Sequence, residues 1–270
     1  MLSGELERMK VWFGRYVDSF GDMPPEDLRN IELKREHTLR VLGCMEQITS
    51  GEGLSPHECL LASVIALLHD VGRFPQYRQW KTFRDSQSDN HARLSLEVIR
   101  AEALLKNLPE DEQILIEEAV RFHNLLELPA QYHSPTDRFI RLIRDADKLD
   151  IWRVFLEYYA QPEHERASAA GLGFPDLPEV TPSCLEALAS GRIVMLDQAR
   201  VLNDFKLLQI SWVYDLNFST TRRLVHALRY IPRLAQTLPQ TPDVRAAVNQ
   251  AFERLQASCA LQQVTTPGLC

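Results

Sequence analysis

Residues 59–73 read CLLASVIALLHDVGR, and this stretch decides how the chain folds. Nearly every position from Cys59 to Leu68 is apolar, so the segment is expected to form a central helix that is buried on all sides. It ends on His69 and Asp70, and burying an imidazole and a carboxylate costs free energy unless a partner offsets that cost. A divalent cation is such a partner, because it binds neutral imidazole nitrogens and carboxylate oxygens. The doublet therefore predicts a buried metal site at the end of this helix.

A capping sequence marks the start of the same helix. Ser55 precedes Pro56, and Glu58 follows Ser55 by three residues. In a capping box the serine and glutamate side chains satisfy each other's backbone amides, and proline suits the first helical position. The sequence therefore predicts a helix from Pro56 to about His69.

Four further side chains that can bind a metal flank the doublet. They are His37 before it and His91, His123 and Asp147 after it. Each stands one helical step from apolar neighbours, so each is expected to point inward from its own helix. Facing helices of an all-α core bring such side chains together even when they are far apart in the sequence. The six residues are therefore predicted to converge on one metal centre.

Helical periodicity dominates the rest of the chain, and no strand longer than a few residues is indicated. Residues 71–90 show no clear period and are interpreted as a long ordered loop, which in a compact domain is usually functional. Residues 161–192 are rich in Pro, Gly and Ala and are expected to be irregular. The other expected helices cover 5–20, 30–47, a stretch that starts at Ser88 or Asp89, one opened by Pro109, one from the Ser134-Pro135 cap to about Tyr159, 195–216, 219–235 and 242–258.

The composition excludes several classes of protein. The 270 residues carry a net charge of −7 and no long Lys/Arg run, which argues against general binding to nucleic acid or to anionic membranes. No apolar stretch reaches the ~18 residues that a membrane span needs, and the first residues show no signal-peptide pattern. The five cysteines are scattered and form no CxxC pair, as in a reducing cytosol. A cytoplasmic location is therefore expected.

The ordered set His37, His69-Asp70, His91, His123 and Asp147, with IRDADKLD at 143–150, resembles the HD superfamily of metal-dependent phosphohydrolases. The resemblance covers about residues 30–155. It implies an all-α fold, an HD-domain helical bundle with additional C-terminal helices. The expected organisation is an N-terminal helix packed on the core (1–29), the HD metal-binding core (30–160), a C-terminal helical extension covering the site (161–258) and a frayed tail (259–270).

The resemblance also implies how the ligands are divided. His37, His69, Asp70 and Asp147 would hold one ion, and Asp70 would bridge to a second ion that His91 and His123 also bind, as in the dinuclear branch of the superfamily. A ligand set without thiolate suits one or two divalent transition metals (Fe, Mn, Co, Ni or Zn), with Mg as a further candidate. Nearby carboxylates should orient the imidazoles, and the candidates are Glu36, Asp89 and Asp145.

The chemistry that this resemblance implies is hydrolysis of a phosphoester or phosphoanhydride bond by a metal-bridged hydroxide. The substrate would be a nucleotide or another small phosphorylated metabolite. Asp70, Arg73 and Lys148 are the expected catalytic residues, because Arg73 follows the doublet by three positions and Lys148 adjoins Asp147. Guanidinium groups suit phosphate geometry, so the expected substrate-binding residues are Arg73, Lys81, Thr82 and Arg84. For the basic residues of the loop, a solvated surface charge is the alternative interpretation.

Two other functions are compatible with the same ligands. Some HD proteins with a similar set are di-iron oxygenases, and an oxygenase substrate can also carry a phosphonate. A third hypothesis is a nucleotide-binding sensor that keeps the HD fold without activity. Degenerate ligands are the usual sign of a sensor, and none of the six is missing here. The basic residues near the doublet favour hydrolysis over oxidation.

Overall fold

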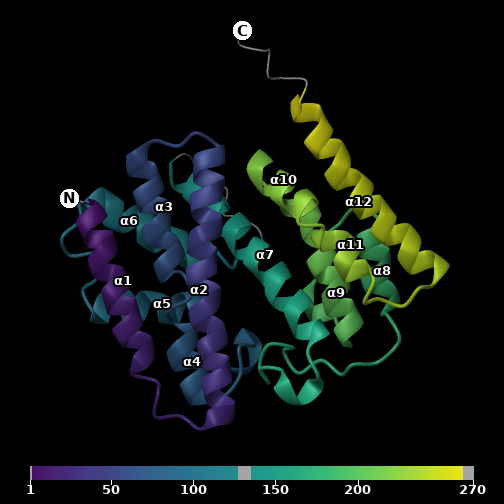
Figure 1. Ribbon diagram of the computed structural model, residues 1–270, viewed down its shortest axis with the longest axis horizontal. Helices are drawn as coiled ribbons and strands as arrows, with labels where there is room; N and C mark the ends of the chain where they lie inside the picture. The colour runs from purple at the N-terminus through teal and green to yellow at the C-terminus, as the bar shows by residue number, and fades with distance from the viewer. Residues whose placement is uncertain (1, 127–134, 264–270) are drawn as a thin grey trace. The chain divides into compact units, whose positions relative to one another are not determined.

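The computed structural model describes residues 2–126 and 135–263, and the regular elements in these ranges are all helices (Figure 1). The all-α fold predicted from the sequence is confirmed. Contacts divide the chain into two compact units. The first unit contains the described residues up to Ile151 and also Glu165–Leu172, and the second contains Trp152–His164 and the described residues from Gly173.

The first unit is built from six helices and the first part of a seventh. The helices are α1 (Leu2–Asp18), α2 (Pro25–Gly51), α3 (Pro56–Leu68), α4 (Arg73–Trp80), α5 (His91–Ala101), α6 (Glu110–Phe122) and α7 (Thr136–Ala160), with a 3-10 turn, η1, at Asp85–Gln87. Ser134, expected to cap α7, lies outside the described residues. The long helix α7 begins in the first unit and ends in the second.

Helix α3 lies at the centre of the first unit, as its apolar sequence predicts. Every residue from Leu61 to Leu68 is buried, and the helix contacts α1, α2 and α6. The predicted capping box is present, since the Ser55 amide donates to Glu58 Oε2 at 2.8 Å and Ser55 Oγ accepts from the Glu58 amide. The central helix therefore starts and ends where the sequence places it, and it delivers His69 and Asp70 into the core.

The prediction of a loop over residues 71–90 is partly wrong, because residues 73–80 form the short helix α4. Its two turns bury Phe74 and Tyr77, which stand three positions apart and therefore share a face. Eight residues are too few for a periodic pattern to stand out in the sequence. Lys81 ends the helix in a left-handed conformation.

Other elements also differ from expectation. Residues 195–216 contain the shorter helix α9 (Leu202–Ser211), and residues 219–235 form two helices, α10 (Ser219–Ala227) and α11 (Tyr230–Ala235). Helix α2 begins at Pro25 rather than near residue 30. Proline is well tolerated at the first helical position, because the backbone N–H that it lacks would have no acceptor inside the helix. Helix α8 (Pro182–Ala189) lies in the stretch expected to be irregular, and it also starts with a proline. Its buried residues Cys184, Ala187 and Leu188 follow a helical spacing that covers barely two turns.

The second unit holds the remaining helices. They are α8, α9 (Leu202–Ser211), α10 (Ser219–Ala227), α11 (Tyr230–Ala235) and α12 (Pro242–Gln263), together with the 3-10 turns η3 (Leu196–Gln198) and η4 (Trp212–Asp215). The residues of the 3-10 turn η2 (Glu163–Glu165) are divided between the two units. Helix α12 contacts α8, α9, α10 and α11, so it ties this unit together. The buried carboxylate of Asp204 accepts hydrogen bonds from the backbone amides of Thr181, Arg200 and Val201. That these helices cover the metal site remains a prediction.

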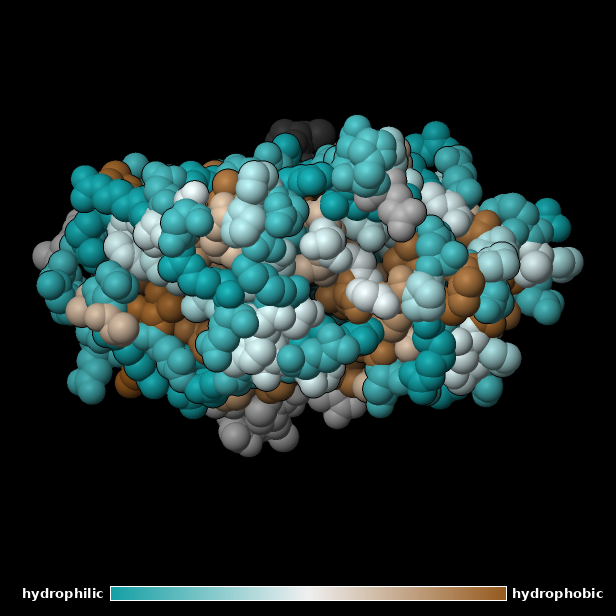
Figure 2. Space-filling model, turned by 90° about the horizontal axis from the view of Figure 1, so that it is seen from below, coloured by the Kyte–Doolittle hydropathy of each residue, from teal (hydrophilic) through white to brown (hydrophobic). Residues whose placement is uncertain are grey.

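The surface is largely polar on the face that Figure 2 shows, where hydrophobic side chains are interspersed among hydrophilic ones. Single exposed apolar residues such as Val11 and Leu228 are ordinary in globular proteins. Among the described helices, none combines the length and the hydropathy that a membrane crossing requires.

A close backbone contact at Gly72 brings α5 against the end of α3. A Cβ atom at this position would overlap the Ser95 amide nitrogen and the His91 carbonyl oxygen. Ser95 Oγ accepts from the Gly72 amide and donates to the His69 carbonyl, both at 2.8 Å. The missing side chain therefore allows His91, the first residue of α5, to reach the His69-Asp70 doublet.

We predict that Gly72→Ala destabilises the protein by about 1–3 kcal/mol, the usual cost of forcing extra atoms into a packed interior. Because α5 must shift to admit the methyl group, binding of Mn²⁺ should weaken as well. Urea unfolding and equilibrium dialysis against Mn²⁺ measure the two effects. Gly43→Ala is the matched control, because a Cβ there meets nothing within 4 Å. Equal stability and equal Mn²⁺ binding in the two variants would contradict the close contact.

Candidate metal centre

The structure brings all six predicted ligands together inside the first unit. His37 lies on α2, the His69-Asp70 doublet follows α3, and His91 begins α5. The other two, His123 directly after α6 and Asp147 on α7, complete the cluster. The four imidazoles and Asp70 are buried, and the Asp147 side chain is 21% exposed. Ligand atoms of the cluster lie within 4.8 Å of one another in three overlapping groups: His37, His69 and Asp70; His69, His123 and Asp147; and Asp70, His91 and His123.

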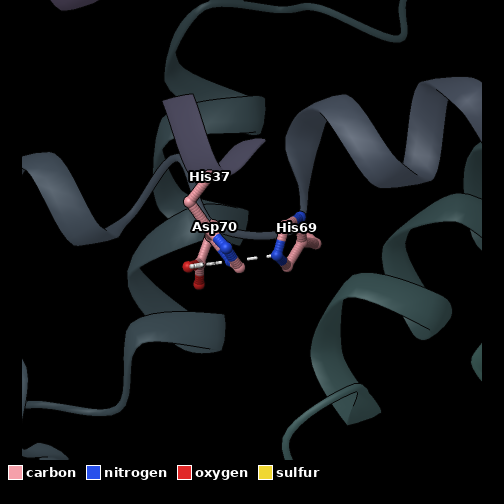
Figure 3. Close-up of side chains that lie close together, drawn as sticks. All are labelled: His37, His69 and Asp70. Atoms are coloured by element: carbon pink, nitrogen blue, oxygen red, sulfur yellow. Dashed lines mark ion pairs between the residues drawn. The ribbon is translucent and has the colours of Figure 1, made fainter. Parts of the chain in front are cut away.

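The carboxylate of Asp70 lies between two pairs of imidazoles. Its Oδ2 atom is 3.7 Å from His37 Nε2 and 3.9 Å from His69 Nε2, and both rings face it in Figure 3. Its Oδ1 atom is 3.6 Å from His91 Nε2 and 3.9 Å from His123 Nε2. One carboxylate oxygen is therefore available to each pair, which is the arrangement that a bridging ligand needs.

The carboxylate of Asp147 lies beside the imidazole pair formed by His37 and His69. Its Oδ1 atom lies 3.0 Å from His37 Nε2 and 3.8 Å from His69 Nε2. Burial would raise the pKa of Asp147, but His37 and His69 hold it well below its usual value. The carboxylate is therefore ionised and able to bind a cation.

The Nδ1 atom of every one of the four imidazoles faces an acceptor. The acceptors for His69 and His123 are the carbonyl oxygens of Ala66 and Val120, one turn earlier in the chain, at 2.8 and 2.7 Å. Since a carbonyl can only accept, Nδ1 carries the proton in both rings. The Nε2 atoms of these two rings are therefore left with their lone pairs directed at the centre.

Carboxylates from other segments accept from the remaining two imidazoles. Asp150 Oδ2 lies 2.8 Å from His37 Nδ1, and Asp85 Oδ2 lies 2.6 Å from His91 Nδ1. Asp150 follows Asp147 by one turn of α7, so its position could have been inferred from the sequence. Asp85 was not predicted from the sequence, because it lies in the segment without periodicity. Of the carboxylates predicted for this role, Asp89 contacts Arg93 instead and Glu36 is exposed.

The imidazole Nε2 atoms of the cluster are hydrogen-bond acceptors that lack donors. His91 Nε2 and His123 Nε2 lie 3.1 Å apart, although each ring has its proton on Nδ1. The Nε2 atoms of His37 and His69 are buried and make no hydrogen bond. Buried polar atoms without a partner are rare, and converging lone pairs repel one another. A divalent cation bound by these nitrogens would offset both costs, so the residues fit a metal ion.

Two cationic side chains flank the Asp70 carboxylate. Lys34 Nζ lies 2.8 Å from Oδ2, and Arg73 Nε lies 3.4 Å from Oδ1. Burial would raise the pKa of Asp70, but these charges, together with His69 and His91, hold it well below its usual value. Lys34 was not among the predicted site residues, although it stands about one helical turn before His37.

The structure gives the other proposed substrate residues different surroundings. Arg73 Nη1 donates to Gln76, to the Phe83 carbonyl and to Asp85 at 2.7–3.0 Å, so much of its guanidinium is already engaged. Lys81 forms an ion pair with Asp27 at 2.6 Å. Thr82 Oγ1 accepts from the amide of Arg84, whose side chain is half-buried, and Lys148 is buried on α7 beside Asp147.

The fold and the site define an all-α protein with a buried centre that can hold divalent ions. Residues 35–152 match the family model described as HD domain. This part of the chain is therefore similar to the HD domain family, whose members are generally metal-dependent hydrolases. No curated protein and no solved structure matches the chain.

The buried histidines predict a pH dependence of the metal-free protein. Burial, with the charges of His91 and His69, lowers the pKa of His123 to about 3, and burial with Arg73 lowers that of His91. Histidines of the unfolded chain titrate near pH ~6.5, so below that pH the unfolded state binds more protons at these positions. The free energy of unfolding should therefore fall as the pH decreases from about 6.5 to about 5.

The other groups of the cluster do not reverse this trend. Burial and Lys34 lower the pKa of His37, but Asp147 and Asp150 outweigh them and raise it, so its stabilising contribution is already complete below pH ~6.5. The ligand carboxylates titrate below this window. Urea unfolding across the window in the presence of a chelator measures the slope, and His123→Gln should make it shallower. An unchanged slope in that variant would show that another group is responsible.

Proposed function

We propose that this protein is a dinuclear metal-dependent phosphohydrolase that cleaves a phosphoester or phosphoanhydride bond in a nucleotide or small phosphorylated metabolite. The observation that carries the proposal is the Asp70 carboxylate, which offers one oxygen to each of two imidazole pairs. His37, His69, Asp70 and Asp147 would hold one ion, and Asp70, His91 and His123 the other. The ligand set suits Fe, Mn, Co, Ni or Zn, with Mg as a further candidate.

When bound, two such ions lower the pKa of a water molecule and polarise the oxygens of a phosphoryl group. The protein supplies the neutral imidazoles and only two ligand carboxylates. Two divalent ions and two carboxylates leave an excess of positive charge, which favours an anionic substrate. Phosphate esters and anhydrides carry such a charge and have oxygens able to bridge two ions.

The positively charged side chains support the same substrate class. The Lys34 side chain is 15% exposed and that of the ligand Asp147 is 21% exposed, so both reach solvent in part. An ammonium group has three donors, and the contact with Asp70 uses one. The other donors of Lys34 can bind a phosphate oxygen. Arg73 and Lys148 remain proposed catalytic residues, with Arg73 also holding Asp70 and the segment around Phe83.

The proposed partner is a small phosphorylated molecule rather than a nucleic acid. The net charge of −7 gives no general attraction to polyanions, so the affinity for phosphate must come from the buried centre itself. A cytoplasmic location is part of the same proposal, because nucleotides and phosphorylated metabolites are made there.

The proposal is tested by hydrolysis of para-nitrophenyl phosphate, bis(para-nitrophenyl) phosphate and a nucleotide panel with added Mn²⁺ or Co²⁺. We expect metal-dependent phosphate or nucleotide release that a chelator abolishes. Asp70→Ala should lose both bound ions and all activity, because it removes the carboxylate shared by the two imidazole pairs. Asp22→Ala removes an exposed carboxylate that pairs with Arg78 and serves as the control. Full metal content in Asp70→Ala would contradict the bridging role, and O₂ consumption without phosphate release would favour the oxygenase.

We predict that Lys34→Met lowers kcat/KM by about 10- to 100-fold, since a hydrogen bond to a charged group contributes about 1.5–3 kcal/mol. Both ions should stay bound, because Lys34 is not a ligand. Steady-state kinetics with parallel metal analysis measures both effects. Lys10→Met removes an exposed lysine that pairs with Glu7 on α1 and should leave the kinetics unchanged. Unaltered kcat/KM in Lys34→Met would exclude Lys34 from the substrate site.

A further inference from the structure

The segment between α4 and α5 carries a carboxylate that contacts one ligand directly. Asp85 Oδ2 lies 2.6 Å from His91 Nδ1 and 3.4 Å from Asn124 Nδ2. Asp85 Oδ1 accepts from Arg73 Nη1 at 3.0 Å and from Gln76 Nε2 at 2.9 Å. Four donors therefore surround a carboxylate that is not itself among the six candidate ligands.

We infer that Asp85 is the positioning residue of the second ion site: it fixes the proton of His91 on Nδ1 and sets the affinity for the ion held by His91, His123 and Asp70. This inference rests on the proposed dinuclear function. A carboxylate that accepts from a ligand imidazole fixes the ring orientation and raises the basicity of the other nitrogen. Asp85 thereby acts on the ion only through His91.

The four imidazoles differ in what holds them. His69 and His123 donate to carbonyl oxygens of the chain just before them, so each is oriented by local backbone. His37 and His91 instead depend on carboxylates from other segments. Asp150, which holds His37, lies on the long helix α7, whereas Asp85 lies in a short connection. The second ion site therefore depends on the correct folding of residues 81–90.

Helix α4 holds this connection in place through Gln76, which is fully buried. The Gln76 amide donates to Asp85 Oδ1, to Ser88 Oγ and to the Asp89 carbonyl at 2.8–2.9 Å, and its oxygen accepts from Arg73. One buried side chain thus fixes Asp85 at the start of the 3-10 turn and the two residues that follow the turn, Ser88 and Asp89.

The Asp85 carboxylate also offsets the positive charge of Arg73 beside the second ion site. Arg73 Nε lies 3.4 Å from Asp70 Oδ1, the oxygen that faces the second imidazole pair. A guanidinium there repels a divalent ion. Asp85 pairs with the same guanidinium through Nη1 and offsets its charge. Loss of the Asp85 charge should therefore weaken the second ion more than the first.

Equilibrium dialysis against Mn²⁺ with metal analysis, combined with electron paramagnetic resonance, tests the inference. We expect two Mn²⁺ per wild-type chain and a spectrum of two coupled ions. Asp85→Ala should keep the first ion and bind the second about 10- to 100-fold more weakly, the usual effect of losing such a partner. Its spectrum should become that of an isolated ion. Asp85→Asn keeps an acceptor without the charge and should fall between the two.

Matched variants separate this effect from general damage. Asp89→Ala removes a carboxylate from the same segment that pairs with Arg93, and it should bind two ions as the wild type does. His91→Ala removes the ligand itself and should lose the second ion. Circular dichroism and the Tm of the metal-free proteins report folding. If Asp85→Ala does not fold, Asp85→Asn decides.

Several results would overturn the inference. They are an unchanged second Kd in the Asp85 variants, equal weakening of both ions, or a wild type that binds only one ion. The phosphatase assay is read separately. Two ions without hydrolysis of any phosphate substrate refute the proposed function, whereas hydrolysis with unchanged ion binding in Asp85→Ala refutes the role of Asp85.

Discussion

The structure of the first unit depends on one buried carboxylate. Asp70 lies where four helices and the end of a fifth converge, with two imidazoles on each of its oxygens. Isolated in a protein core, such a group would be strongly destabilising. Lys34, Arg73 and the imidazoles surround it, and the Nε2 atoms of His37 and His69 beside it make no hydrogen bond, which favours a cation as their partner. The all-helical core thus serves to place these groups at one point.

The orientation of the imidazoles is as important as their presence. Each of the four rings donates through Nδ1, so all four Nε2 atoms face inward. Two rings take their acceptor from the preceding turn of the chain, so local backbone is enough to orient them. The other two need Asp150 and Asp85, which tertiary packing brings to them. The half of the centre that contains His91 therefore depends on the fold of the segment after α4. The half that contains His37 depends on the long helix α7.

Backbone packing sets the distance between the two halves. Gly72 and Ser95 join the end of α3 to the start of α5, and Ser95 also holds the carbonyl of His69. The match to the HD domain model covers residues 35–152, so it lies within the first unit except for its last residue. The second unit has its own core, centred on α12 and the buried residue Trp152, and no ligand motif was found in its sequence.

The sequence by itself determined the all-α fold, the central buried helix with its capping box, and the order of the six ligands. These features follow from local rules: helical periodicity, capping chemistry, and the cost of burying His69 and Asp70 without a partner. Only the tertiary structure revealed α4, the Lys34 and Arg73 contacts with Asp70, and the Asp85 carboxylate beside His91. Residues 71–90 show no period because Gln76, Asp85 and Ser88 are fixed by hydrogen bonds to one another rather than by a repeating apolar face. Such contacts depend on which segments meet in space, and spacing along the chain carries no record of them.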